Sequence, residues 1–293
     1  MEFSFDLEAS IQMVLKLLKK SSLIPWHRPL ASVLIGLGCV IFSSIPLSEV
    51  QAQKTPKPED VVERTILAYG GRAALYKIQN NGSLRASIKF FSPTGDRSGE
   101  SMTKFIRKEK IIEDLVMIQL DLPDTKYQIG FDGKVPWTIH NGEIQTPSEQ
   151  EVKAFRTSQE RSYEAMLRYK ENNFKLEYAG SYKLGTLDLD LIDLISPEGS
   201  RTRYEISRRT ARIIYINYED KSETDAEPTK YRLYFKNFTP IQNTLVPFET
   251  QVFQNGKLVE ERRLREAVFN IQLDEKAFKA ENANKPPEPP PGL

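Results

Sequence analysis

Few side chains in this 293-residue chain could perform chemistry that depends on cysteine or histidine. The chain has one cysteine, Cys39, and two histidines, His27 and His140. Cys39 and His27 lie in an N-terminal segment with the layout of an export signal, so processing would leave His140 alone. One histidine without cysteine supplies neither a His-rich zinc site nor a disulfide. His140 precedes Asn141-Gly142, a dipeptide typical of tight hairpins, and we expect it at the exposed end of such a hairpin.

Acidic side chains offer a second chemistry. Asp188, Asp190 and Asp193 are interspersed with leucines in the segment 186–194. At strand spacing, Asp188 and Asp190 share one face. Calcium binding, or a carboxylate pair that hydrolyses a glycoside, could use such a face, but a solvated outer face is the plainer interpretation. A carboxylate-dependent hydrolase therefore remains an alternative.

Recognisable catalytic and cofactor motifs are missing from the sequence. It contains no nucleophile elbow, phosphate-binding loop or dinucleotide-binding fingerprint. We therefore expect a non-enzymatic protein with no cofactor and no catalytic, metal-binding or cofactor-binding residues.

The charge is nearly balanced, with 41 lysines and arginines against 40 aspartates and glutamates, which argues against a nucleic-acid partner. One group of arginines is interpreted as a solvated edge, with contact to an anionic lipid headgroup as the alternative. The group comprises Arg201, Arg203, Arg208, Arg209 and Arg212.

Residues 1–52 carry the three parts of a secretory signal peptide. Basic residues come first, an apolar run follows from Leu30 to Ile45, and Val50-Gln51-Ala52 resembles a cleavage site. The apolar run has about 16 residues, so an uncleaved membrane anchor is the alternative. Met13 is an alternative start. Residues 53–57 would form a linker, and we expect export across the inner membrane to the periplasm or the cell envelope.

After the linker, the hydrophobic period changes from helical to strand-like. Pro58 opens a helix whose apolar face ends at Tyr69, and Gly70-Gly71 stops it. A short helix over Ala73–Ile78 follows. From Asn81 the apolar residues alternate, which predicts half-buried antiparallel strands. Further strands are expected over 101–107, 114–122, 127–131, 137–140 and 143–145.

One amphipathic helix separates this run of strands from a second run. Thr146 would cap its N-terminus, Pro147 would take the first helical position, and Glu149 would complete a capping box. We expect the helix to end near Asn172-Asn173. The second run comprises strands over 175–178, 187–195, 203–207, 213–218, 230–236, 248–254 and 258–269, and the Pro-rich residues 281–293 form an extended tail.

Several short motifs occur in an order that resembles the LolA-like superfamily of outer-membrane lipoprotein-sorting and carrier-like exported proteins. The motifs are Tyr69-Gly70-Gly71 at a helix end, Phe131-Asp132-Gly133 before Trp137, Leu245-Val246-Pro247-Phe248, and Phe269-Asn270 before Phe278. The resemblance implies an α+β fold, in which a strongly curved antiparallel β-sheet forms an open half-barrel with a few helices on its concave side. This fold would occupy one domain over 58–280.

The same resemblance implies that the protein is exported and non-enzymatic. It would bind lipids or lipoproteins and bury their acyl chains in an apolar cavity. Such a protein would be a monomer whose partners are lipid or lipoprotein acyl chains and an envelope protein. An envelope sensor or scaffold that binds a protein partner is the alternative. No ligand residue of the lipoprotein carrier can be matched, so none is carried over.

The alternating strand faces supply candidates for the lining of such a cavity, because their apolar residues would form either core or ligand contacts. The candidates are Leu84, Ile88, Phe90, Val116, Ile118, Leu120, Tyr127, Ile129, Phe131, Tyr231, Leu233 and Phe235.

Overall fold

The computed structural model describes residues 55–220 and 227–283. The signal peptide, Cys39, the first two residues of the linker and most of the Pro-rich tail lie outside these ranges, so what was expected of them stays a prediction. Within the described ranges, none of the helices combines the length and the apolar character needed to cross a membrane.

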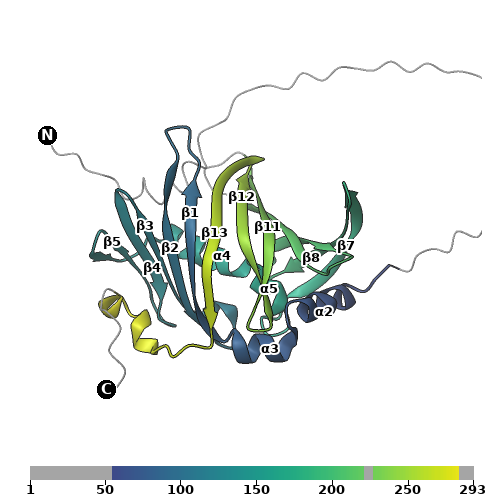
Figure 1. The fold of residues 1–293 in the computed structure, drawn as a ribbon, viewed down its shortest axis with the longest axis horizontal. Helices are drawn as coiled ribbons and strands as arrows, with labels where there is room; N and C mark the ends of the chain where they lie inside the picture. Colours follow the sequence, from purple (N-terminus) through teal and green to yellow (C-terminus); the bar gives the residue numbers. More distant parts are fainter. Residues whose placement is uncertain (1–54, 221–226, 284–293) are drawn as a thin grey trace, which may run out of the picture. The chain divides into compact units, whose positions relative to one another are not determined.

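Thirteen antiparallel strands form one open sheet (Figure 1). Its order is β6-β5-β4-β3-β2-β1-β13-β12-β11-β10-β9-β8-β7, so the first six strands form one meander and the last seven form another. The two meanders meet where β1 pairs with β13. The strands are β1 (Asn81–Phe90), β2 (Arg97–Ile106), β3 (Leu115–Leu122), β4 (Thr125–Phe131), β5 (Pro136–His140), β6 (Glu143–Gln145), β7 (Lys175–Leu184), β8 (Leu187–Ile195), β9 (Arg201–Ser207), β10 (Ile213–Asp220), β11 (Thr229–Ile241), β12 (Thr244–Gln254) and β13 (Lys257–Phe269).

Turn chemistry explains how the first meander forms. The predicted hairpin at Asn141-Gly142 is confirmed, with φ angles of 48° and 94°, the left-handed values that a tight hairpin turn requires. One strand earlier, Gly130 of β4 lies opposite Trp137 of β5. A Cβ at Gly130 would lie 2.2 Å from the indole ring, so only glycine admits the ring at this place.

The C-terminal end of the described chain covers the β3–β5 part of one sheet face. Two short 3₁₀ helices, η2 (Glu275–Phe278) and η3 (Ala280–Asn282), lie there. Phe278 packs among Leu115, Met117 and Ile139, and its carbonyl oxygen accepts a 2.7 Å hydrogen bond from Nε1 of Trp137. This closing segment therefore stabilises the face of the sheet that carries no α-helix.

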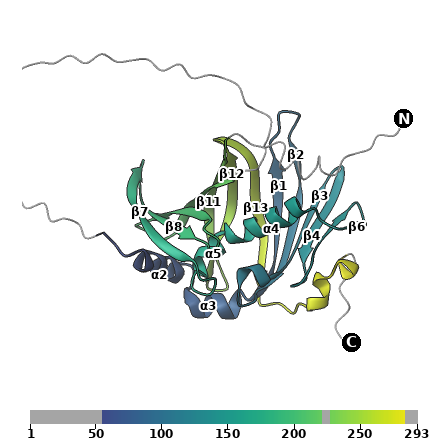
Figure 2. The ribbon, with the colours of Figure 1, turned by 180° about the vertical axis from the view of Figure 1, so that it is seen from behind.

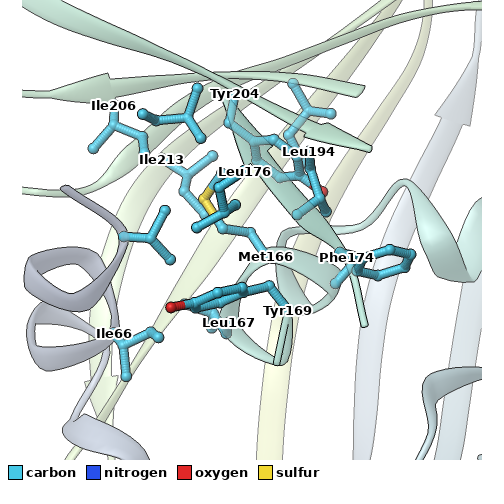
Figure 3. Packing of buried hydrophobic residues seen from close by; sticks show 14 of the residues in the cluster. Ile66, Met166, Leu167, Tyr169, Phe174, Leu176, Leu194, Tyr204, Ile206 and Ile213 are labelled. Carbon is cyan, nitrogen blue, oxygen red and sulfur yellow. The ribbon is translucent and has the colours of Figure 1, made fainter. Parts of the chain in front are cut away.

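The other sheet face, here called the helix-bearing face, packs against α-helices. They are α2 (Pro58–Ala68), α3 (Gly71–Ile78), α4 (Glu149–Glu160) and α5 (Tyr163–Leu167). Ile66 of α2 and Met166 of α5 contribute to the main core with Tyr204 and Ile206 of β9 (Figure 3). Because α2 buries four side chains and α5 buries three, these two helices are firmly packed against the β7–β11 part of the sheet.

The expectation of one helix between the meanders is wrong in two respects. The N-cap is Ser148 and not Thr146: the Ser148 hydroxyl accepts from the Glu151 N–H, and the Glu151 carboxylate accepts from the Ser148 N–H at 2.7 Å. Serine is the better N-cap, so this second capping box prevails over the first. The helix then breaks at Arg161, because Ser162 caps a new helix, α5, by accepting from the Ala165 N–H.

The junction of α2, α3 and α5 contains a carboxylate whose ionisation should affect stability. Burial raises the pKa of Glu63, but hydrogen bonds from Arg72 and Lys170 outweigh burial and lower it from 4.5 to about 2. A lowered folded-state pKa gives stability that is complete above the unfolded pKa and is lost as the pH falls through the folded pKa.

We therefore expect the free energy of unfolding to fall as the pH drops from 4.5 to about 2, by less than about 1 kcal/mol for this half-exposed group. Urea unfolding of wild type and Glu63→Gln across this range measures it, and the two curves should converge at the acid end. Glu143→Gln, which changes an exposed hairpin carboxylate, is the control. A constant difference between wild type and Glu63→Gln at all pH values would contradict the assignment.

Candidate functional site

Strand pairing places all twelve candidate lining residues on the helix-bearing face. In the first meander, Ile118 of β3 lies directly opposite Ile129 of β4, and Leu120 lies opposite Tyr127. In the second meander, Phe235 packs in the core with α2 and α5. Alternation along β11 puts Leu233 and Tyr231 on the same side as Phe235. Their common placement makes one apolar surface, while their role in lining a ligand cavity stays a prediction.

This surface is only partly covered. Ile88, Phe90, Phe131 and Phe235 are buried. The other eight candidates are half-buried, which is unusual for apolar side chains that share a face with packed helices. They are Leu84, Val116, Ile118, Leu120, Tyr127, Ile129, Tyr231 and Leu233.

Helix α4 crosses the helix-bearing face from the first meander to the second (Figure 2). At its start, Glu151 accepts a 3.5 Å hydrogen bond from the Tyr127 hydroxyl of β4. At its end, the guanidinium of Arg161 lies 4.5 Å from the ring centre of Tyr218 on β10. Of the residues of α4, only Phe155 is buried. The helix therefore spans the half-buried apolar surface and buries far less of itself than α2 or α5.

A polar cluster interrupts the apolar surface near the C-terminal end of α4. Arg262 and Glu260 of β13 form an ion pair of 2.9 Å, and Arg262 lies between Ile88 of β1 and Thr250 of β12. The ring of Tyr218 stacks on that of Tyr231 at 4.9 Å. We name Arg161, Tyr218, Tyr231, Glu260 and Arg262 the polar cluster.

Charged groups near Tyr218 act on its ionisation. Burial raises the pKa of Tyr218 to about 12, Arg161 opposes that shift, and Asp220 and Glu260 add to it. The sequence did not predict the cluster, because residues 260–263 put one glutamate and one arginine on each face of β13. Glu260 and Arg262 take one face, and Glu261 and Arg263 take the other. Only the pairing with β12 and β1 shows which pair shares the apolar side.

The aspartates of β8 do not all lie on a solvated face, as the sequence had suggested. Asp188 is exposed, but Asp190 and Asp193 are buried, so the interpretation as a solvated outer face is wrong for both. Asp190 lies on the helix-bearing face and accepts from Arg208 at 2.7 Å and from the Tyr178 hydroxyl at 3.0 Å. Asp193 lies on the opposite face of β8, so it cannot act with Asp190 on one substrate, while a carboxylate pair of Asp188 and Asp190 stays a prediction.

The arginine group does not form a merely solvated edge either. Arg203 binds Asp193 through two hydrogen bonds of 2.7 and 2.8 Å, and Arg201 adds a third of 2.6 Å. Burial raises the pKa of Asp193, but these bonds outweigh burial and lower it. Arg212 lies over the ring of Phe238. Most of these arginines therefore neutralise buried carboxylates or contact rings within the protein.

The opposite face of β9–β12 contains an open groove of about 860 Å³. Aromatic rings in this groove contact arginine side chains and one another. The guanidinium of Arg232 lies 3.8 Å from the centre of the Tyr215 ring, and that ring stacks on the ring of Tyr234 at 4.7 Å. Arg232 is in turn paired with the buried Glu205 at 3.0 Å. The charges and ring faces here mostly satisfy one another. Within residues 55–220 and 227–283, no group of three or more His, Cys, Asp or Glu side chains could hold a metal ion.

Comparison with known proteins shows which fold this arrangement represents. No family model and no curated protein matches the sequence. A DUF1329 family protein from Desulfovibrio piger matches the structure with a TM-score of 0.54 at 11% identity, covering 77% of this chain and 99% of its own. A LolA superfamily protein from Nitrosomonas europaea matches with a TM-score of 0.53 at 10% identity, covering 77% and 99%.

An outer membrane lipoprotein-sorting protein domain from Vibrio parahaemolyticus matches with a TM-score of 0.51 at 10% identity, covering 76% of this chain and 96% of its own. Likeness at such low identity concerns the fold. The thirteen-stranded open antiparallel sheet with a few helices, and the resemblance of the motifs, agree with these matches. The fold of this chain is LolA-like.

Proposed function

We propose that this protein is exported, is not an enzyme, and binds lipid or lipoprotein acyl chains. The acyl chains would bind to the helix-bearing face of the sheet, beneath α4. The observation that carries the proposal is the set of eight half-buried apolar residues, drawn from both meanders, on that one face. Soluble monomers seldom leave a contiguous apolar surface open unless it binds something. The signal-like residues 1–52 support a location in the periplasm or cell envelope.

The energetics of acyl burial suit such a surface. Removing one CH₂ group from water contributes about 0.8 kcal/mol, so a chain of about twelve carbons offers close to 10 kcal/mol before the cost of association. Because α4 has one buried side chain, Phe155, a shift of α4 would lose little packing energy. An acyl chain could therefore replace contacts beneath α4 without disturbing the core that α2 and α5 form.

The test is binding of a neutral single-chain amphiphile, dodecanol, by the full chain, measured by calorimetry. Wild type is expected to bind, and Ile129→Asn is expected to weaken binding by about tenfold, since a polar amide would replace an apolar contact on this surface. Val135→Asn, which changes an apolar residue that is 62% exposed in the β4–β5 turn, is the matched control and should leave the affinity unchanged.

Mass spectrometry of lipids that co-purify with the full chain from cell envelopes provides an independent measurement. Absence of a co-purifying amphiphile, together with no dodecanol binding, would overturn the proposed function and favour the alternative of a sensor or scaffold for a protein partner. If Ile129→Asn and wild type bind dodecanol with equal affinity, the binding site does not lie on this face.

A further inference from the structure

We propose that the polar cluster is a recognition site for an anionic head group, a carboxylate or a phosphate, of the amphiphile whose chain lies beneath α4. This inference rests on the proposed function and adds to it a ligand class and the residues that select it. Arg262 and Arg161 would donate hydrogen bonds to the head-group oxygens. The acyl chain would extend from there toward Ile118 and Ile129.

The first argument is the unsatisfied hydrogen-bonding capacity of the two arginines. Nε of Arg262 and one terminal nitrogen of Arg161 are buried and have no hydrogen-bond partner among the described residues. Buried donors of this kind are rare, because leaving one unpaired is energetically costly. An oxyanion offers several acceptor positions and forms charge-assisted hydrogen bonds with guanidinium groups.

The second argument is the position of Arg262. It stands on β13 with Ile88 on one side and Thr250 on the other, in the middle of an apolar surface where a charge is not expected. Its side chain is 40% exposed although its Nε is buried, so part of the guanidinium can still be reached. Arg161 lies at the break between α4 and α5, with its guanidinium over the ring of Tyr218.

The third argument is the pairing of the two guanidinium groups. Arg262 forms an ion pair with Glu260 at 2.9 Å, whereas Arg161 contacts the ring of Tyr218 and forms no ion pair within the described residues. An anionic head group would supply the direct counter-charge that Arg161 lacks, whereas a cationic head group would be repelled.

The chain provides a matched control for the key residue. Arg263 pairs with Glu261 at 2.8 Å, two positions back along β13, as Arg262 pairs with Glu260. The two pairs differ in the face that they occupy, since Arg263 lies opposite Glu249, away from the helix-bearing face. Arg262→Met and Arg263→Met therefore remove the same group from the same strand and differ in access to the apolar surface.

The experiment compares dodecanoate, dodecyl phosphate, dodecanol and dodecyltrimethylammonium by calorimetry with the full chain. Wild type should bind dodecanoate or dodecyl phosphate at least about tenfold more tightly than dodecanol, a difference of about 1.4 kcal/mol. Arg262→Met should reduce that ratio to about one while dodecanol affinity is kept, and Arg263→Met should retain the wild-type ratio. Whether dodecanoate or dodecyl phosphate binds more tightly distinguishes the two kinds of head group.

Equal binding of dodecanoate, dodecyl phosphate and dodecanol by wild type would overturn the head-group site and leave the proposed function standing. Binding of none of the four would overturn the proposed function itself. A ratio unchanged in Arg262→Met would also overturn the assignment. The wild-type comparison needs no variant, so the result does not depend on the folding of Arg262→Met.

Discussion

Replacing Arg168 with methionine is expected to lower the free energy of unfolding by about 3–5 kcal/mol, because it leaves a buried carboxylate without its counter-charge. Arg168 and Asp114 have side chains that are 8% and 6% exposed and pair at 2.5 Å. Arg168 also donates to the Lys108 carbonyl oxygen at 2.6 Å, so it ties α5 to the loop that follows β2. Chemical denaturation followed by circular dichroism measures the loss.

Two controls separate the buried charge from the loss of the side chain. The double variant Arg168→Met, Asp114→Asn should recover part of the stability, because the amide keeps an acceptor for the Lys108 N–H without a negative charge. Arg85→Met removes an exposed arginine 3.6 Å from Glu266 and should cost less than about 1 kcal/mol. If Arg168→Met and Arg85→Met cost the same, the buried pair does not stabilise the fold as described.

Replacing Gly130 with alanine is expected to cost about 2–3 kcal/mol, near the upper end of what overpacking costs. The new Cβ would lie 2.2, 2.4 and 2.8 Å from three atoms of the Trp137 ring. The ring cannot move away easily, because Nε1 is bonded to the Phe278 carbonyl oxygen and the ring packs against Leu115 and Met117. Thermal and urea unfolding both measure the loss.

A double-mutant cycle shows whether the indole causes this cost. Trp137→Ala alone should cost about 3–5 kcal/mol. In that background, Gly130→Ala should cost close to nothing, because the clashing ring is gone and alanine suits a strand at least as well as glycine. Additive losses in the double variant would show that the ring is not the obstacle.

Local patterns predicted the strands wherever turn residues and alternation coincide. The bounds of β8, Leu187–Ile195, agree with the prediction, because Gly185 precedes the strand and Pro197 follows it. By contrast, β11 and β12 continue beyond their predicted limits, to Ile241 and from Thr244. Pro240 and Pro247 obscure this extension, since proline is usually a sign against pairing, yet Pro240 lies opposite Leu245 here.

The polar part of the candidate site could not be derived from local patterns. The burial of Asp190 and Asp193 depends on arginines that the pairing and the hairpins around β9 bring beside β8. The placement of Arg262 depends on a shift in the pairing of β1 with β13, where Arg265 of β13 is left without a partner across from Arg85 and Ala86, and sequence alternation cannot show it. The apolar residues were easier to identify, because a strand alternates in the same way whichever strand lies beside it.

The pairing of β1 with β13 has a consequence for how the chain folds. Among the described strands, every other neighbouring pair is consecutive along the chain, whereas Gly82 meets Phe269 across almost the whole domain. Each meander can form through local hairpins, but their union requires closure of a very long loop, which raises the contact order and slows folding. A circular permutant that joined the end of η3 to the start of α2 and opened between β6 and α4 would turn all thirteen strands into a single meander. Its native contacts would be the same, and closure of the very long loop would no longer be needed.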